Sequence, residues 1–182
     1  IPSYNFTVAT LQRRLGKNSN LRGIFVNRQE FSDGKDPFRL AGFNYNRVAG
    51  LDYNYRFAGN KWTGNAYIHK LITPDPKPGQ ASGGYSVVYN TQSTTFQWYH
   101  QRIGSGFDPA VGFVPRNGYN RISPSGNYLF YPKSSAINSH GPMLDVSYIW
   151  DDVYGLTDYE YRGMYSVRMQ SQAEFSVGYR HT

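Results

Sequence analysis

Histidine and carboxylate side chains are the first candidates for chemistry, because they bind metal ions and transfer protons. No histidine stands at ligand spacing from another ligand-type residue, and lone histidines on strands are more often surface residues: His69, His100, His140 and His181. The adjacent Asp151 and Asp152 would point to opposite faces of a strand, so we assign them to a turn before Gly155. The sequence predicts no metal site and no cofactor.

Enzyme signatures are also missing from the sequence. The three glutamates, Glu30, Glu160 and Glu174, form no obvious carboxylate pair for glycoside hydrolysis. No G-x-S-x-G nucleophile motif occurs, and the glycine-rich residues 82–84 lack the lysine of a phosphate-binding loop. We therefore expect a protein that is not an enzyme and has no catalytic residues.

The composition fits a boundary between hydrocarbon and water. The chain has 182 residues, with 17 Tyr, 11 Phe, 3 Trp and no Cys. Aromatic side chains with a polar tip suit such a boundary. Mean hydropathy is negative. The sequence contains no apolar run of about 18 residues, which argues against a transmembrane helix. Membrane barrel strands also keep a low mean hydropathy, because only every second residue meets lipid.

Basic residues outnumber acidic ones by 19 to 12, and the net charge is +7. This excess is compatible with a solvated basic surface, with an arginine-lined lumen, or with loops that face anionic lipid headgroups. No recognition helix, RNP pattern or zinc spacing is present. We expect no nucleic-acid partner.

A period of two from Asp158 to Met169 is the strongest pattern in the chain, and it recurs from Val48 to Phe57. Such alternation indicates β-strands that separate two environments. One row is mainly apolar and is expected to face lipid: Leu51, Tyr53, Tyr55, Phe57, Tyr159, Tyr161, Tyr165 and Val167. The opposite row is polar and is expected to face a water-filled lumen: Asp52, Asn54, Arg56, Asp158, Glu160, Arg162 and Arg168.

Turn-forming residues divide the chain into a succession of strands. We expect strands at Phe6–Leu15, Leu21–Phe31, Val48–Phe57, Trp62–Thr73, Tyr85–Asn90, Thr95–Ile103, on both sides of Ser123–Gly126, and at Leu144–Trp150. The last region, from Asp158 toward Thr182, is either one long strand or two strands broken near Gln170–Gln172, and we favour one continuous strand. Short turns near residues 16, 59, 92, 126 and 155 alternate with longer segments at 32–45, 74–84, 104–118 and 132–142. This alternation predicts an antiparallel up-and-down transmembrane β-barrel. A soluble β-sandwich that binds carbohydrate is the alternative.

One long connection carries apolar residues and two prolines, which indicates an ordered loop. We expect it to plug a lumen, to cover a rim, or simply to pack on its neighbours. Its candidate residues are Phe107, Asp108, Pro109, Gly112, Phe113, Pro115 and Arg116.

Three stretches of the sequence carry a family resemblance: residues 112–116 with 107–109 before them, residues 4–8 with 11–14 and 21–24, and residues 46–53. They resemble the C-terminal barrel domain of an uncharacterised family of Bacteroidota outer-membrane proteins. The N-terminal part of that family is similar to carbohydrate-binding module family 9. The resemblance spans at least residues 4–132.

The resemblance implies a location in the bacterial outer membrane. The amphipathic strands predict a role as a pore or as a structural component of an outer-membrane assembly, and the resemblance links this role to glycan handling. The expected partners are outer-membrane lipid and lipopolysaccharide, with other outer-membrane proteins and glycan as further candidates. We expect residues 1–182 to form a single segment of a larger barrel, cut at both ends, since the chain ends at Thr182 without a terminal aromatic residue.

Overall fold

Antiparallel β-strands make up the regular structure of this chain. The computed structural model describes residues 3–31 and 44–182, and no helix in this part is long and apolar enough to cross a membrane. The strands are β1 (Ser3–Leu15), β2 (Ser19–Phe31), β3 (Tyr45–Phe57), β4 (Trp62–Ile72), β5 (Ala81–Asn90), β6 (Thr94–Ile103), β7 (Tyr119–Ile122), β8 (Ser125–Tyr128), β9 (Ile137–Asp151), β10 (Gly155–Met169) and β11 (Glu174–His181).

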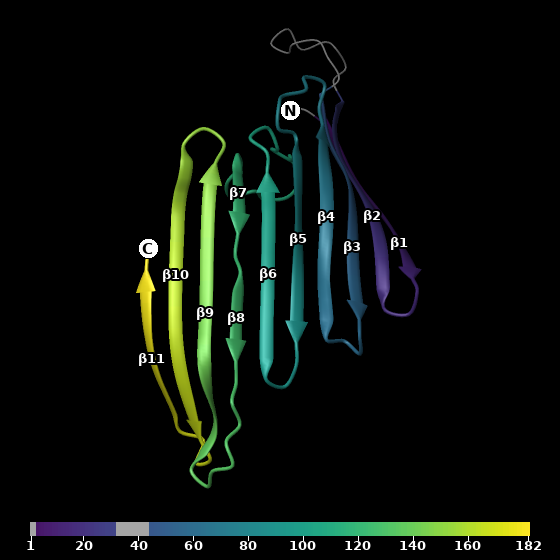
Figure 1. Cartoon of the computed structure of the whole chain (residues 1–182). Helices are drawn as coiled ribbons and strands as arrows, with labels where there is room; N and C mark the ends of the chain where they lie inside the picture. Colours follow the sequence, from purple (N-terminus) through teal and green to yellow (C-terminus); the bar gives the residue numbers. More distant parts are fainter. Residues whose placement is uncertain (1–2, 32–43) are drawn as a thin grey trace. The chain divides into compact units, whose positions relative to one another are not determined.

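All eleven strands belong to one sheet, in the order β1-β2-β3-β4-β5-β6-β7-β9-β10-β11, and β8 pairs with both β6 and β9 (Figure 1). The all-β antiparallel fold predicted from the sequence is therefore confirmed. A sandwich would require two packed sheets, whereas the described strands form one.

Contacts between residues divide the chain into two compact units. Unit 1 comprises Ile1–Asn54, Asn65–Gly84 and Arg102–Tyr119. Unit 2 comprises Tyr55–Gly64, Tyr85–Gln101 and Asn120–Thr182.

The strand ends follow from local turn chemistry. In unit 1, β1 and β2 pair from Ser3 opposite Phe31 to Leu15 opposite Ser19, and Gly16 turns the chain with a φ of 65°. In unit 2, the Asp151 carboxylate accepts hydrogen bonds from the backbone N–H groups of residues 153 and 154, at 2.7 and 3.3 Å. The turn predicted before Gly155 is thus confirmed.

The prediction of one continuous strand from Asp158 toward Thr182 is wrong. The chain reverses after Met169, and β10 and β11 pair antiparallel from Arg168 opposite Glu174 to Tyr161 opposite His181. Gln172 has a φ of 70°, and its N–H donates to the Met169 carbonyl at 3.1 Å. A left-handed residue without a glycine signal closes this turn.

The short turn predicted near Gly126 is also wrong. Both β7 and β8 pair with β6 and β9, so together they form one interrupted strand rather than a hairpin. Pro124 lies at the interruption, and its carbonyl accepts a hydrogen bond from the Val146 N–H at 2.9 Å. Proline has no N–H to donate, which interrupts the ladder without turning the chain.

The predicted alternation of short and long connections holds in part. Short connections follow β1, β3 and β5, and long ones follow β4 and β6. The expected connection at residues 32–45 lies mainly outside the described residues. The long connection before β9 and the short turn before Gly155 are present as predicted, at 129–136 and 152–154. With β7 and β8 counted as one strand, however, strict alternation would require a short turn at the first of these positions and a long connection at the second.

Candidate functional site

The strand register of unit 1 defines two chemically different faces. Residues directly opposite each other in antiparallel strands point to the same side of the sheet. One side carries the row Leu11, Gly23 and Leu51. We call it the Leu51 face. The other side carries the next row, in which Arg22 pairs with Asp52. We call it the Asp52 face.

A charged network lies on the Asp52 face. The Arg22 guanidinium donates from Nε and Nη2 to Oδ2 of Asp52, at 2.9 and 2.7 Å. The His69 imidazole Nε2 lies 2.9 Å from the other carboxylate oxygen. Asp52 is 9% exposed, so most of its surface faces protein rather than water. A Cβ at Gly50 would collide with the His69 ring, and the glycine therefore leaves room for this arrangement.

The loop after β6 folds onto the same face. Phe107 is buried in a cluster with Val48, Leu71 and Ile103. The Asn46 side chain fixes the loop backbone, because its Nδ2 donates to the Asp108 carbonyl and its Oδ1 accepts from the N–H of residue 110, both at 3.0 Å.

The remaining loop candidates lie nearer to solvent. Phe113 is 87% exposed, Gly112 has a φ of 107°, and Pro109 is half-buried. Pro115 is exposed, and the Arg116 guanidinium lies 5.6 Å from the Tyr119 ring centre. The apolar side chains of the loop that pack at the sheet are thus Phe107, at its beginning, and the half-buried Val114.

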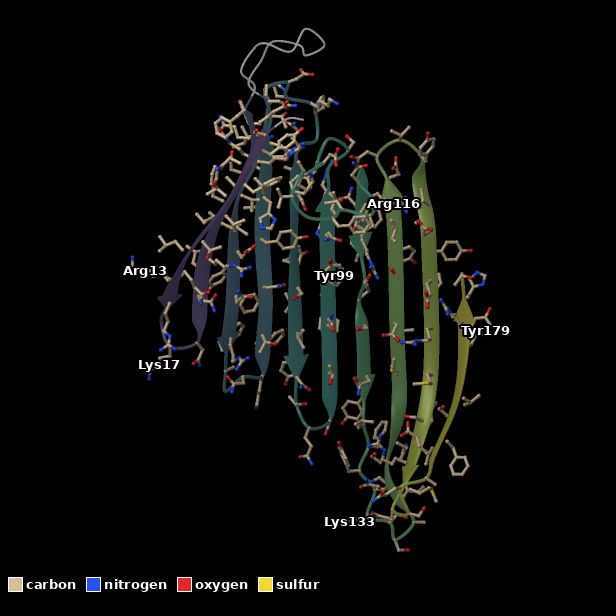
Figure 2. The ribbon with its side chains drawn as sticks, turned by 180° about the vertical axis from the view of Figure 1, so that it is seen from behind. Arg13, Lys17, Tyr99, Arg116, Lys133 and Tyr179 are labelled. Carbon is tan, nitrogen blue, oxygen red and sulfur yellow. The ribbon has the colours of Figure 1, made fainter. Side chains whose placement is uncertain are left out.

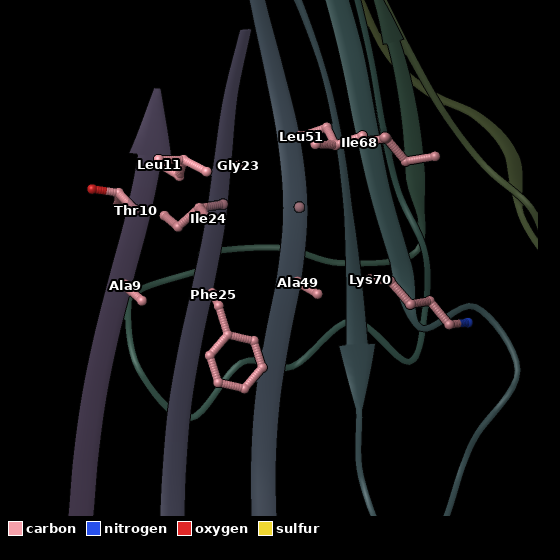
Figure 3. Close-up of a pocket in the computed structure, with 11 residues that line it drawn as sticks. Ala9, Thr10, Leu11, Gly23, Ile24, Phe25, Ala49, Leu51, Ile68 and Lys70 are labelled. Carbon is pink, nitrogen blue, oxygen red and sulfur yellow. The ribbon is translucent and has the colours of Figure 1, made fainter. Parts of the chain in front are cut away.

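The Leu51 face is largely apolar and open. Leu51 and Tyr53 are exposed. Leu51 lines a hollow of about 610 Å³ that extends over the four strands from β1 to β4 (Figure 3). Near the start of β3, which we call the long-loop end of the face, the face becomes polar. There Arg47 Nε donates to Asn27 Oδ1 at 2.9 Å. Asn54, on the Asp52 face, donates to the Oδ1 atom of residue 20 at 3.2 Å.

The last residues of β3 belong to unit 2 and contain an aromatic cluster. The Tyr55 and Phe57 rings stack at 5.9 Å, and Phe57 stacks on Trp62 at 6.1 Å. Trp62 in turn lies 4.7 Å from Tyr89. Arg56, expected in the polar row, is exposed.

In unit 2, the apolar candidates of β10 share one face, which we call the Tyr161 face. Its rows across β9, β10 and β11 join Tyr161 to Val146 and His181, and Val167 to His140 and Phe175. Figure 2 places Tyr179 on β11, in the row between these two.

Three tyrosine hydroxyls of this face have polar partners. Tyr161 bonds to the hydroxyl of Tyr148, Tyr165 bonds to Nδ1 of His140 at 2.5 Å, and Tyr159 lies 3.3 Å from Nε2 of His181. A polar tip that already has a partner costs less free energy in an apolar environment.

The opposite face of β9, β10 and β11 carries the charges, and we call it the Glu160 face. Arg162 pairs with Asp145 at 2.7 Å, Arg168 with Glu174 at 2.9 Å, and Arg180 with Glu160 at 3.0 Å. The fourth candidate of β10, Asp158, accepts a bond from the hydroxyl of residue 157 at 2.8 Å. Each of the three pairs joins neighbouring strands, so the charges form ladders across the sheet.

A polar hollow of about 340 Å³ lies on the Glu160 face. Tyr99 on β6, located in Figure 2, lines it together with Ser123, Ser147 and the charged ends of Arg121 and Arg162. The two serine hydroxyls are 3.2 Å apart, and Arg121 Nε donates to the first of them at 3.0 Å. The surface offers hydroxyls, guanidinium groups, the carboxylates of Asp145 and Glu160 and one aromatic ring to a polar solute.

The sequence did not single out Arg22 or the cross-strand partners Asp145 and Arg180, and it did not identify Asp52 as the partner of His69. These groups are distant in the chain from the residues that they bind, and only the strand register reveals them. Within the described part of the chain, no group of three or more histidine or acidic side chains could hold a metal ion. In comparisons with known proteins, no family model, curated protein or solved structure matches this chain.

Proposed function

We propose that the chain is part of an outer-membrane β-barrel that acts as a pore or as a structural component of an outer-membrane assembly. In this proposal the Leu51 and Tyr161 faces contact lipid hydrocarbon, and the Asp52 and Glu160 faces border water. The observation that carries it is the two-sided character of β9–β11, with three ion pairs on one face and rows of Tyr, Val and Phe on the other.

Strand dimensions support this proposal. The strands β9 and β10 have 15 residues each, and β1, β2 and β3 have 13 each. About 9–11 residues suffice for a tilted strand to cross a bilayer, whereas strands of soluble proteins are most often about 5–6 residues long. From Tyr159 to Val167 the aromatic row extends over roughly 27 Å at about 3.4 Å per residue, close to the roughly 25 Å apolar band of membrane barrels.

Burial supports it as well. Only four hydrophobic side chains are buried among the described residues: Val48, Leu71, Ile103 and Phe107. Many others, such as Leu51 at 52% and Phe175 at 65%, are exposed. Lipid contact would remove these side chains from water and account for their exposure. The resemblance of three sequence stretches to an outer-membrane barrel family agrees with this proposal.

Single cysteines at two neighbouring positions of β10 test the proposal. The protein has no native cysteine, so each introduced thiol is the only one. Ser166 and Val167 lie on opposite faces, neither belongs to an ion pair, and both are half-buried. In reconstituted protein, we expect a charged maleimide to label Ser166→Cys much faster than Val167→Cys. A fluorophore attached at residue 167 should be quenched by brominated lipid chains.

The outcome that overturns the proposal is equal labelling of both positions by the charged reagent, with no quenching by lipid at either. Protein that stays monodisperse without detergent and does not bind liposomes would show this equal labelling without quenching. A charged maleimide applied to the unfolded chain in urea supplies the control, because both thiols should then react at the same rate.

A further inference from the structure

We propose that the hollow on the Leu51 face binds one anionic membrane lipid, with its acyl chain over β2 and β3 and its acidic headgroup at Lys70 and Arg47. The inference rests on the proposed membrane function, and adds a ligand and its site to it.

Small residues set between large ones create the hollow. Figure 3 shows two rows of side chains across β1, β2, β3 and β4. In the first row Gly23 lies between Leu11 and Leu51, with Ile68 beyond them. In the second row Ala49 follows Phe25, and Lys70 is the last residue of the row. Gly23 and Ala49 leave a floor of backbone and methyl group, and the larger side chains form apolar walls. The volume of about 610 Å³ is in the range of small-molecule sites, about 300–1,000 Å³.

Lys70 lies at one end of this apolar hollow. Gly50 and His69 are opposite each other, because a Cβ on the glycine would meet the His69 ring. The next pair along β3 and β4 is therefore Ala49 and Lys70, on the Leu51 face. Lys70 is exposed and has no hydrogen-bond or ion-pair partner among the described residues.

Arg47 adds a second positive charge at the same end. It lies two residues from Ala49 on the same face of β3, toward the long-loop end. Its guanidinium donates to the side-chain oxygens of Asn27 and Gln29, at 2.9 and 3.3 Å, and lies 4.3 Å from the Tyr45 ring centre. These partners are neutral, and the charge has no carboxylate partner within the described chain.

The combination selects an amphiphilic anion. A chain of CH₂ groups gains from the apolar walls. Two cations that have no carboxylate partner among the described residues lie at one end of these walls and attract an acidic headgroup. A zwitterionic lipid would gain the first contribution but much less of the second. A second copy of this chain would bury the apolar walls but would have to bring an acidic group to Lys70 and Arg47.

Native mass spectrometry of the full chain in detergent, with phosphatidylglycerol or phosphatidylcholine of identical acyl chains, tests the inference. We expect one retained phosphatidylglycerol, bound more tightly than phosphatidylcholine. With about 1 kcal/mol per cation near the headgroup, Lys70→Gln should weaken phosphatidylglycerol binding about fivefold and Lys70→Gln with Arg47→Gln about thirtyfold. Binding of phosphatidylcholine should not change.

Removal of two other cations gives the matched control. Arg13 lies at the opposite end of the Leu51 face, and Lys17 lies in the β1–β2 turn; both are labelled in Figure 2. Arg13→Gln with Lys17→Gln should leave the preference for phosphatidylglycerol intact. Ala49→Leu should fill the hollow and weaken the binding of both lipids.

Three results would overturn the inference. These are equal binding of the two lipids by the native chain, loss of the preference in the control pair alone, and a dimer in place of the lipid adduct. The failure of the membrane proposal is distinguishable, because it would appear as equal labelling at residues 166 and 167. If that labelling differs as expected while the two lipids bind equally, only the lipid site is refuted.

Discussion

Two phenylalanines in the loop after β6 give a direct test of whether this loop is held on the sheet. Phe107 is 5% exposed and packs with Val48, Leu71 and Ile103, whereas Phe113 is 87% exposed. Each is changed to alanine, so the two variants lose the same atoms from the same loop. Their effects should differ because only one of the two rings lies in an apolar cluster.

The size of the difference follows from burial. Moving a phenylalanine side chain out of water contributes about 1.5–3 kcal/mol, and an unfilled cavity raises the cost of Phe107→Ala to about 3–5 kcal/mol. For a chain of this size, about 2–4 °C of Tm corresponds to 1 kcal/mol. We expect Phe107→Ala to lower Tm by about 6–20 °C. Phe113→Ala should change the stability by less than about 0.5 kcal/mol.

Circular dichroism melts of both variants in the same detergent measure the two shifts. Limited trypsin digestion supplies a local readout, because the exposed Arg116 lies in this loop and a loop that leaves the sheet enters a protease active site more readily. We expect faster cleavage after Arg116 in Phe107→Ala than in Phe113→Ala. Equal melting temperatures together with equal cleavage rates would refute the packing of Phe107 against β3 and β4.

Two further pairs of variants test the ion pairs and the close backbone contacts. Asp52→Asn removes the charge that binds Arg22 at a side chain that is only 13% exposed, and should lower the free energy of unfolding in urea by about 1–3 kcal/mol. Glu174→Gln changes a side chain that is 48% exposed, and should lower it by at most about 1 kcal/mol. Equal losses in the two variants would contradict the difference in burial. Gly141→Ala would press a Cβ against the Tyr128 carbonyl and should destabilise by about 1–3 kcal/mol. Gly163→Ala, with nothing within 4 Å, should leave the melting temperature nearly unchanged, and a reversed order would contradict the strand packing.

The faces of β3 and β10 were predictable from the sequence because a pleated strand turns side chains to alternate sides. The rows of Leu51 and Asp52, and of Tyr161 and Arg162, lie on opposite faces as the alternation requires. This information is local. It gives the side of the sheet to which a residue points, but not the residue that lies beside it.

The charged network was not predictable in the same way. Arg22 and His69 stand 30 and 17 residues from Asp52 in the chain. Bringing them together depends on the register of two hairpins, and a shift by one residue would turn each to the other face. The strongest clue in the sequence is Gly50, whose missing side chain makes space for the His69 ring. A glycine within a strand equally marks a bulge or a tight bend, so Gly50 alone does not identify the histidine beside it.

The two errors in the strand prediction have a common cause. The residues around Pro124 have the composition of a turn, but the structure shows only an interrupted strand there. Pro124 has no N–H to donate, and its carbonyl still accepts a hydrogen bond from Val146 of β9. Counting a reversal at this point shifts all later connections to the wrong end of the sheet. The segment before Gln172 then falls where a long loop is expected, which favoured a continuous strand. Once the reversal at Pro124 is removed, the tight turn at Gln172 falls at the same end as the short turns after β1, β3 and β5. A proline in a strand can therefore mislead the topology far beyond its own position, because antiparallel connections alternate between the two ends of a sheet.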